Sequence, residues 1–369
     1  MNKIFFIFLF FLSGLIKAQI VNPSNMDTVS GEHIGKIAIA GYLDTYYNYN
    51  FNQPKDGNIS YLVSMNRHNE ANINLAYIDL RYKSERLRAR FAPGFGTYVN
   101  TNYASETGTL KNLIEANAGL KIFKDKEIWL DYGVLSSPYT NESAISKDHL
   151  MYTRSFAPEY VPYYLSGLKL SMPLGAKITA YLYLINGWQQ IQDQNQGKSV
   201  GTQIEYRPNN KNLINWNTYL GDERSSLSPN NRMRYFTDLY WIHNPDGRFS
   251  FTSCAYIGLQ KKIDPLNNNN NNIWWQANLI AKQKLNKNLS ISGRIEYFND
   301  PKNVQIAPLN PVGFNSFSTG ACLNINLFNN AMIRLEAREF FSDKKVYLNN
   351  KGNPINQSTC LVSNLTIWF

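Results

Sequence analysis

Apolar and polar residues alternate along most of the chain, which is the pattern of β-strands whose two faces meet different surroundings. From Ile37 to Phe51, one face is mainly apolar and aromatic, and the other carries Asp44 and several asparagines and tyrosines. The segments 289–298 and 331–338 repeat this alternation. We therefore expect strands with one face toward an apolar medium and one face toward water.

About sixteen strands of this kind can be placed along the chain. We expect them at 37–51, 71–82, 87–99, 112–122, 128–135, 163–172, 177–186, 199–207, 213–221, 233–243, 248–259, 273–283, 288–298, 316–327, 331–342 and 357–369. Most are close to the ~9–11 residues with which a tilted strand crosses a bilayer. The last of them ends on an aromatic residue, Phe369.

The connections between these strands alternate between short and long. Short connections with turn residues lie at 83–86, 123–127, 173–176, 208–212, 244–247, 284–287 and 328–330. Long connections include 52–70, 136–162, 299–315 and 343–356. A soluble β-sandwich has no reason for this asymmetry, whereas an outer-membrane barrel has short periplasmic turns and long extracellular loops. The predicted fold is all-β, a transmembrane antiparallel β-barrel of about sixteen strands over residues 37–369.

Two stretches depart from the simple pattern. Between Ile73 and Tyr82 both faces are apolar, so the alternation changes phase near Tyr77, which indicates a β-bulge or a lumenal element packed against the wall. The six asparagines Asn267 to Asn272 form a low-complexity run, and we expect them at the mobile tip of an external loop.

The beginning of the chain has the order of a secretory signal peptide. Lys3 precedes an apolar run at 4–12, and the small residue Ala18 follows where cleavage is expected. We predict a signal peptide at 1–18 and a short, unstructured periplasmic lead-in at 19–36. Beyond it no run of ~18 apolar residues occurs, as a membrane helix would need, and the mean hydropathy is −0.38. Only a closed barrel could then span the membrane.

Composition and charge fit this assignment. Aromatic residues make up 14% of the chain, enough for belts at both membrane interfaces. We expect the following aromatics in the lipid-facing phase or at strand ends: Tyr47, Tyr49, Phe51, Trp216, Trp241, Trp275 and Phe369. The formal charge of +10 falls to +8 without Lys3 and Lys17, which favours anionic lipid heads or a charged pore over nucleic acid. The cysteines Cys254, Cys322 and Cys360 show no disulfide or metal spacing.

Several short motifs, taken in order, resemble a known family. They are Gly41 to Tyr47, Asn50 to Asn52, Arg67 to Glu70, Glu115 to Gly119, Met151 to Ser155, Pro162 to Tyr164 and Asn186 to Trp188. This series is similar to the β-barrel porin family described as OmpL-like, and the resemblance covers nearly all of the chain after the signal peptide. It implies a porin-like protein in the outer membrane of a Gram-negative bacterium.

A barrel of about sixteen strands is wide enough for an aqueous channel. The longest connection, 136–162, is the third of the long loops, and we expect it to fold inward and constrict the pore; the alternative is a solvated surface loop. Its charged residues are the predicted constriction residues: Glu142, Lys147, Asp148, Arg154 and Glu159, with His149 among them. The predicted function is passive diffusion of small hydrophilic solutes.

Arginines on the polar face of the strands are the predicted pore wall. They are Arg88, Arg90, Arg294, Arg334 and Arg338. Opposite an acidic loop, a basic wall would set up a transverse field that orients polar solutes. The alternative is that these arginines simply pair with Asp44, Asp131 or Glu336.

Other functions lack the residues they need. The histidines His33, His68, His149 and His243 are far apart, and no zinc, phosphate-loop or nucleophile-elbow motif occurs. We therefore expect no enzyme, no cofactor and no metal. The main alternative function is a non-conducting barrel that acts as a surface adhesin, receptor or scaffold through its long loops. Expected partners are outer-membrane lipid, lipopolysaccharide and small solutes; whether the protein forms a homotrimer is left open.

Overall fold

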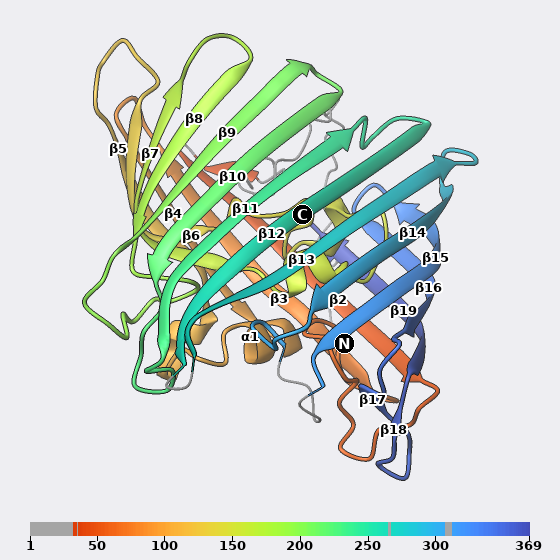
Figure 1. The fold of residues 1–369 in the computed structure, drawn as a ribbon. Coiled ribbons are helices and arrows are strands. Elements are labelled where there is room, and N and C mark those ends of the chain that lie inside the picture. Colours follow the sequence, from red (N-terminus) through yellow and green to blue (C-terminus); the bar gives the residue numbers. More distant parts are fainter. Residues whose placement is uncertain (1–31, 35, 265–266, 307–311) are drawn as a thin grey trace, which may run out of the picture.

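The computed structural model describes residues 32–34, 36–264, 267–306 and 312–369. The predicted signal peptide 1–18 and most of the lead-in 19–36 lie outside this part of the chain. Within it, sixteen antiparallel strands form one closed ring, which confirms the predicted barrel (Figure 1). The strands are strongly tilted, as closure of a sheet requires.

The strand bounds agree closely with the predicted ones. The ring consists of β2 (Ile37–Asn50), β3 (Ala71–Lys83), β4 (Leu87–Phe95), β5 (Leu113–Lys121), β6 (Trp129–Ser136), β7 (Tyr164–Pro173), β8 (Ile178–Ile185), β9 (Ser199–Asn209), β10 (Asn212–Asp222), β11 (Asn231–His243), β12 (Phe249–Asp264), β13 (Asn267–Lys284), β14 (Leu289–Asp300), β15 (Phe314–Phe328), β16 (Ala331–Phe341) and β19 (Gln357–Trp368). Outside the ring lie β1 (Glu32–Ile34), β17 (Tyr347–Leu348) and β18 (Pro354–Ile355). The helical turns are α1 (Thr97–Asn102), α2 (Phe156–Glu159), η1 (Gly108–Asn112) and η2 (Ser146–Asp148).

The last strand closes the ring on the first. β19 pairs with β2 from Cys360 opposite Asn50 to Trp368 opposite Tyr42. Beyond the strand, the backbone N–H groups of Gly41 and Phe369 each donate to the other residue's carbonyl at 3.1 Å. Every other strand of the ring pairs with its neighbours in sequence. No strand edge of the ring is therefore left for lipid or for another chain.

The predicted faces of the strands are also observed. Large apolar side chains are exposed on the outside along the whole ring, such as Leu43 on β2, Ile257 on β12, Ile295 on β14 and Leu335 on β16. Their neighbours in sequence point inward and are buried, polar or aromatic. The belt aromatics predicted from the sequence lie on the outside, with Trp216 and Phe369 among the most exposed. The apolar surface therefore faces lipid.

Three local predictions need correction. Residues Asn267 to Asn272 are not a loop tip, because they begin β13 and pair with β12, Gln260 opposite Asn272. The lead-in contains a strand, since β1 pairs with β2 with Glu32 opposite Ile39. The third predicted strand, 87–99, ends at Phe95, where Gly96 with φ 127° turns the chain into α1.

The phase change in β3 is produced by a bulge, as expected, but at Asn74 rather than Tyr77. Leu75 opposes Asp44 and Ile73 opposes Thr45, so Asn74 has no opposite residue on β2. Its side chain turns inward and donates to Asp44 Oδ2 at 2.9 Å. Beyond the bulge Leu75 points into the barrel and is buried there. The segment therefore has both a β-bulge and lumenal packing against the wall, the two explanations offered from the sequence.

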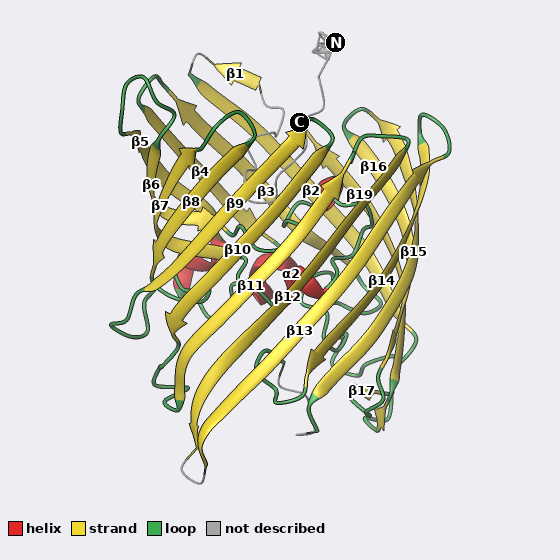
Figure 2. Ribbon diagram, turned by 45° about the horizontal axis from the view of Figure 1, so that its top comes forward, coloured by secondary structure: helices red, strands yellow, loops and turns green. Residues whose placement is uncertain are grey.

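Long loops fill much of the interior of the barrel. In Figure 2, α2 lies within the ring of strands, and the helix contacts β12, β13 and β14. The buried aromatic residues cluster there, for example Phe156 of α2 with Phe298 and Phe340 of the wall, each at 5.7 Å between ring centroids. The helices among the described residues are all too short or too polar to cross a membrane.

The lipid-facing assignment predicts an asymmetric response to charge. Leu335 lies in the middle of β16 with 47% of its surface exposed, whereas Leu227 is 88% exposed in the connection 223–230. Leu335→Arg should lower the free energy of unfolding from lipid vesicles by ~2–4 kcal/mol, because it places a charge in the bilayer core. Leu227→Arg is the control, expected within ~0.5 kcal/mol of the parent. Denaturant titration in vesicles measures both; equal losses would contradict the assignment.

Candidate functional site

The connection between β6 and β7, residues 137–163, runs through the interior of the barrel; we call it the lumenal loop. It corresponds to the predicted constriction loop 136–162. Its first part contacts the wall at β10 to β12: Asn217 donates to Pro138 O at 2.9 Å, and Asp238 Oδ2 accepts from Thr140 N at 2.7 Å. Its second part contacts β14 and β16. The loop begins at β6, and β14 lies eight strands from β6 in the ring of sixteen, so the loop crosses the lumen.

Inward side chains of β14 and β16 form the contact on this second side, which we call the anchor cluster. It consists of Arg294, Glu296, Arg334, Glu336 and Arg338, all buried. The strand between them, β15, places Gly320 level with Arg294 and Arg338, and Ser318 level with Glu296. Because these β15 residues are small, the long side chains of β14 and β16 can meet across them.

Within the anchor cluster, two of the three arginines pair with a glutamate. Arg294 Nη2 lies 2.9 Å from Glu336 Oε1, and Arg338 Nη2 lies 2.5 Å from Glu296 Oε1. Charges taken out of water are stable only with such close pairing and further hydrogen bonds. The further hydrogen bonds go to the lumenal loop.

The carboxylates of the anchor cluster accept hydrogen bonds from the backbone of the loop. Glu336 Oε2 accepts from the N–H groups of Tyr152 and Thr153 at 2.8 and 2.9 Å. Glu296 Oε2 accepts from the N–H of Phe156 at 2.6 Å. The lumenal loop has little regular structure, so most of its backbone groups lack partners within the loop. These bonds replace the water that the loop loses inside the barrel.

The arginines donate to carbonyl groups of the same loop. Arg294 Nη1 donates to Thr153 O at 2.7 Å, and Arg338 Nη1 donates to Arg154 O at 2.8 Å. Arg334 Nη1 reaches Ser146 O at 2.6 Å. Donors and acceptors of the loop are thus both satisfied by one group of wall residues.

A second long loop packs on the lumenal loop. In the connection 51–70, the N–H groups of Val63 and Ser64 donate to Glu159 Oε2 at 2.7 and 2.9 Å. Glu159 also lies 3.2 Å from Arg154. The first long loop therefore holds the end of the lumenal loop in place.

The predicted constriction residues lie in this loop, but most are engaged in local contacts. Lys147 pairs with Asp148 at 2.6 Å, and Arg154 pairs with Glu159. Glu142 is buried, with one carboxylate oxygen accepting from Ser155 N at 2.8 Å.

The predicted wall arginines fall into two separate groups. Arg294, Arg334 and Arg338 belong to the anchor cluster. Arg88 and Arg90 lie on β4, where Arg88 pairs with Asp131 at 2.5 Å and Arg90 pairs with Asp79 at 2.8 Å and Glu115 at 2.6 Å.

Sequence reasoning placed Glu336 only as a pairing partner and did not include Glu296 or Asp238. The sequence does contain a signal for the two glutamates. Arg-x-Glu recurs in the inward phase of two strands, at 294–296 and 334–336, and in the second segment Arg338 follows. Asp238 carries no such signal, because its partner Thr140 lies far away in sequence.

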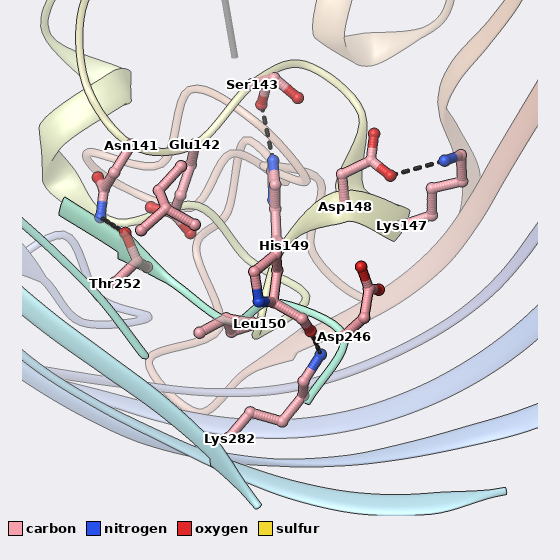
Figure 3. A pocket seen from close by; sticks show the side chains of 12 residues that line it. Asn141, Glu142, Ser143, Lys147, Asp148, His149, Leu150, Asp246, Thr252 and Lys282 are labelled. Carbon is pink, nitrogen blue, oxygen red and sulfur yellow. Dashed lines mark hydrogen bonds and ion pairs between the residues drawn. The ribbon is translucent and has the colours of Figure 1, made fainter. Parts of the chain in front are cut away.

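A pocket lies between the lumenal loop and the wall on the periplasmic side (Figure 3). Loop residues Asn141 to Ser143 and Lys147 to Leu150 line it, together with Asp246, Thr252 and Lys282. Burial raises the pKa of Glu142 above its ordinary value, although Arg294 acts in the opposite direction. Burial, together with Arg154, Arg334 and Arg294, holds the pKa of His149 well below its ordinary value, so its imidazole is neutral. Among the described residues, no group of three or more His, Cys, Asp and Glu side chains could hold a metal ion.

A closed ring with an apolar exterior, a polar interior and a loop crossing its lumen defines an outer-membrane barrel of the porin type. The family model described as "Putative beta-barrel porin-2, OmpL-like" matches residues 36–369, and the chain belongs to this family. Its place is the outer membrane of a Gram-negative bacterium. No curated protein matches the chain.

Solved outer-membrane proteins share the fold at very low sequence identity. The outer-membrane channel DcaP of Acinetobacter baumannii superposes with a TM-score of 0.59 at 10% identity, over 90% of this chain and 97% of that one. The anion-selective porin of Comamonas acidovorans gives 0.58 at 9% identity, over 90% and 99%. OmpT of Vibrio cholerae in a trimer form gives 0.53 at 8% identity, over 90% and 99%. These similarities concern the fold alone.

The anchor cluster predicts how the loop can be released. Glu336→Ala removes the acceptor of two loop N–H groups and leaves Arg294 without its nearest anion. Breaking a buried pair in this way costs ~3–5 kcal/mol, so trypsin should cleave the folded protein after Lys147 and Arg154 roughly tenfold faster or more. Glu339→Gln, on the same strand but bonded to Gln357 and Thr359, should leave the rates unchanged. Equal cleavage in both variants would show that Glu336 does not hold the loop.

Proposed function

We propose that the protein is an outer-membrane channel for passive diffusion of small hydrophilic solutes, narrowed by the lumenal loop. Its family and its porin-like structural neighbours support the channel. The constriction is supported by one observation above all. The loop is bonded both to β11, through Thr140 and Asp238, and to β16, through Thr153 and Glu336. Solutes would then pass beside or through the loop rather than through an open bore.

The arrangement of charge favours weak ion selectivity. The wall arginines predicted to create a transverse field are each engaged: Arg88, Arg90, Arg294 and Arg338 with wall carboxylates, and Arg334 with loop oxygens. Closely paired charges cancel over a short distance, so the field that reaches a solute is small. The contacts thus favour mutual pairing, and we propose that uncharged polar solutes pass most readily.

A second candidate function rests on the packing of the lumen. Phe156 of the lumenal loop lies against Phe298, Phe314 and Phe340 of the wall, and Tyr61 of the first long loop covers Phe314 at 4.6 Å. Such an apolar cluster inside the ring would obstruct a bore on that side. It favours a barrel that does not conduct and instead acts as an adhesin, receptor or scaffold through its loops. Ionic current through the purified protein separates the two functions.

Partners are part of the proposal. The apolar exterior calls for outer-membrane lipid, with lipopolysaccharide on the outer leaflet. A homotrimer is supported by the trimer form of the V. cholerae protein.

Shortening the lumenal loop tests the constriction. Replacing residues 141–154 with a short Gly-Ser linker should raise the single-channel conductance in planar bilayers about twofold or more, because the narrowest section widens. The control is removal of 224–229 from the exposed connection between β10 and β11, which should leave the conductance unchanged. An unchanged conductance after shortening, in a protein that still folds, would rule the loop out as the constriction.

Ion preference tests the electrostatic part. Arg81 and Arg88 retain lumen-accessible side chains, 16% and 29% exposed, beside Asp79 and Asp131. Arg81→Gln and Arg88→Gln together remove two positive charges from this wall, although Arg90 still pairs with Asp79 and Lys169 lies 3.5 Å from Asp131. The K⁺ to Cl⁻ permeability ratio should therefore rise about twofold. Reversal potentials across a KCl gradient give this ratio. Arg86→Gln, in the turn 84–86, should not change it; if the double variant also behaves like the parent, charge on this wall does not govern permeation.

A further inference from the structure

Two pockets meet at the beginning of the lumenal loop. The pocket of Figure 3 is built on the periplasmic side, with Pro245 and Asp246 of a short turn in its lining. A second pocket opens on the extracellular side, between the loop and the ends of β5 and β6, with Tyr98, Tyr139 and Tyr163 in its lining. Glu142 and Ser143 line both pockets. These two residues of the loop therefore lie between the two pockets.

Five buried polar atoms at this junction have no hydrogen-bond partner among the residues that the structure describes. They are Glu142 Oε1, His149 Nδ1, Thr140 Oγ1 and the Nε and Nη1 atoms of Arg154, which lines the second pocket. The four residues are 4%, 7%, 0% and 3% exposed, respectively. A buried polar group without a partner is costly and rare in folded proteins. The residues that carry these atoms line the two pockets, and the atoms themselves lie beneath the pocket surface, so a molecule in the pockets could satisfy them after the side chains rotate.

The chemistry of the unsatisfied groups indicates what that molecule offers. His149 Nε2 lies 2.9 Å from the Ser143 carbonyl and donates to it, so Nδ1 of the neutral ring is an acceptor. The other oxygen of Glu142 accepts from Ser155, and Oε1 has no hydrogen-bond partner. The pocket lysines already have partners: Lys147 bonds to Asp148, and Lys282 donates to Pro245 O at 3.0 Å. Acceptors on His149 and Glu142 and donors on Arg154 remain without a hydrogen-bond partner, so the site calls for a molecule whose groups both donate and accept hydrogen bonds.

A positively charged donor is disfavoured at the same place. The guanidinium groups of Arg154, Arg294 and Arg334 lie close enough to oppose protonation of His149. The donor should then be an uncharged hydroxyl. The extracellular pocket adds tyrosine rings, whose faces suit the C–H surface of a small ring or chain.

We propose that this junction is a binding site for a neutral polyhydroxylated solute, a monosaccharide or a sugar alcohol, whose hydroxyl groups bond to His149 Nδ1, Glu142 Oε1 and Thr140 Oγ1. The inference rests on the proposed channel function, because it names the solute class that crosses the constriction. It adds to that function a saturable site within the path.

The test measures binding and conduction separately. Glucose and mannitol are titrated into the full-length detergent-folded protein by calorimetry, and into the chambers of a planar bilayer while the ion current is recorded. We expect saturable binding and a matching partial block of the current. His149→Phe keeps a ring of similar shape without the acceptor and should weaken binding about threefold to tenfold, the effect of one hydrogen bond.

Controls keep the result decisive. His243→Phe alters a histidine bonded to Asn212 outside the pockets and should bind like the parent. If His149→Phe does not fold, Thr140→Val takes its place, because it removes the unpartnered hydroxyl with little change of shape. Sugar binding that is two- to threefold weaker, about half of the effect expected for a full hydrogen bond, then supports the site. No saturable binding of either sugar, equal binding in all variants, or stronger binding of putrescine or acetate would overturn the proposal. Binding without any ionic current would instead uphold the site and contradict the channel.

Discussion

The interior of a bilayer holds no water, so each backbone N–H and C=O group of a spanning segment must find its partner within the protein. In this chain the two edge strands, β19 and β2, meet this requirement by pairing with each other, which converts a sheet with two free edges into a ring. Closure also fixes the phase of every strand: with lipid on one side, Leu335 must point outward, and Arg334 and Glu336 must point inward. The charged interior is thus a consequence of the ring, and the site is built from it.

Inside the ring the same requirement returns in a different form. The lumenal loop has little regular structure, and the barrel shields it from solvent, so its backbone also needs partners. Carboxylates supply them at four places: Glu296 and Glu336 at the anchor cluster, Asp238 on β11, and Glu142 within the loop itself. The arginines beside them donate to the loop carbonyls and stabilise the carboxylates as anions. Most charged groups in this lumen therefore hold the loop, and a passing solute can approach mainly the partly exposed ones, such as Arg81 and Arg88.

The sequence predicts the ring well because strand periodicity is local: each face can be read from alternate residues, and the short turns mark the ends. It predicts much less of the site, since the partners there are far apart. Arg294 and Glu336 meet across β15, where Gly320 stands opposite Arg294 and Cys322 opposite Glu336, and nothing near Arg294 in sequence indicates this contact. Composition was misleading at Asn267 to Asn272, where six asparagines suggested a loop. There the hydrogen-bond ladder with β12 continues regardless of side-chain preference.

A lumen whose charges are mostly paired has a consequence for what can cross it. An ion that leaves water needs compensation from fixed charges, and here those charges already compensate one another. An uncharged polar solute needs only hydrogen bonds, and unsatisfied acceptors remain at Glu142 and His149, where the two pockets meet. The ion pairs that hold the loop across the ring thus reduce the electrostatic stabilisation that an ion could gain in the lumen. They do not reduce the hydrogen bonding that a hydroxyl group could gain there. Selectivity would then follow from how the loop is anchored rather than from a dedicated charged filter.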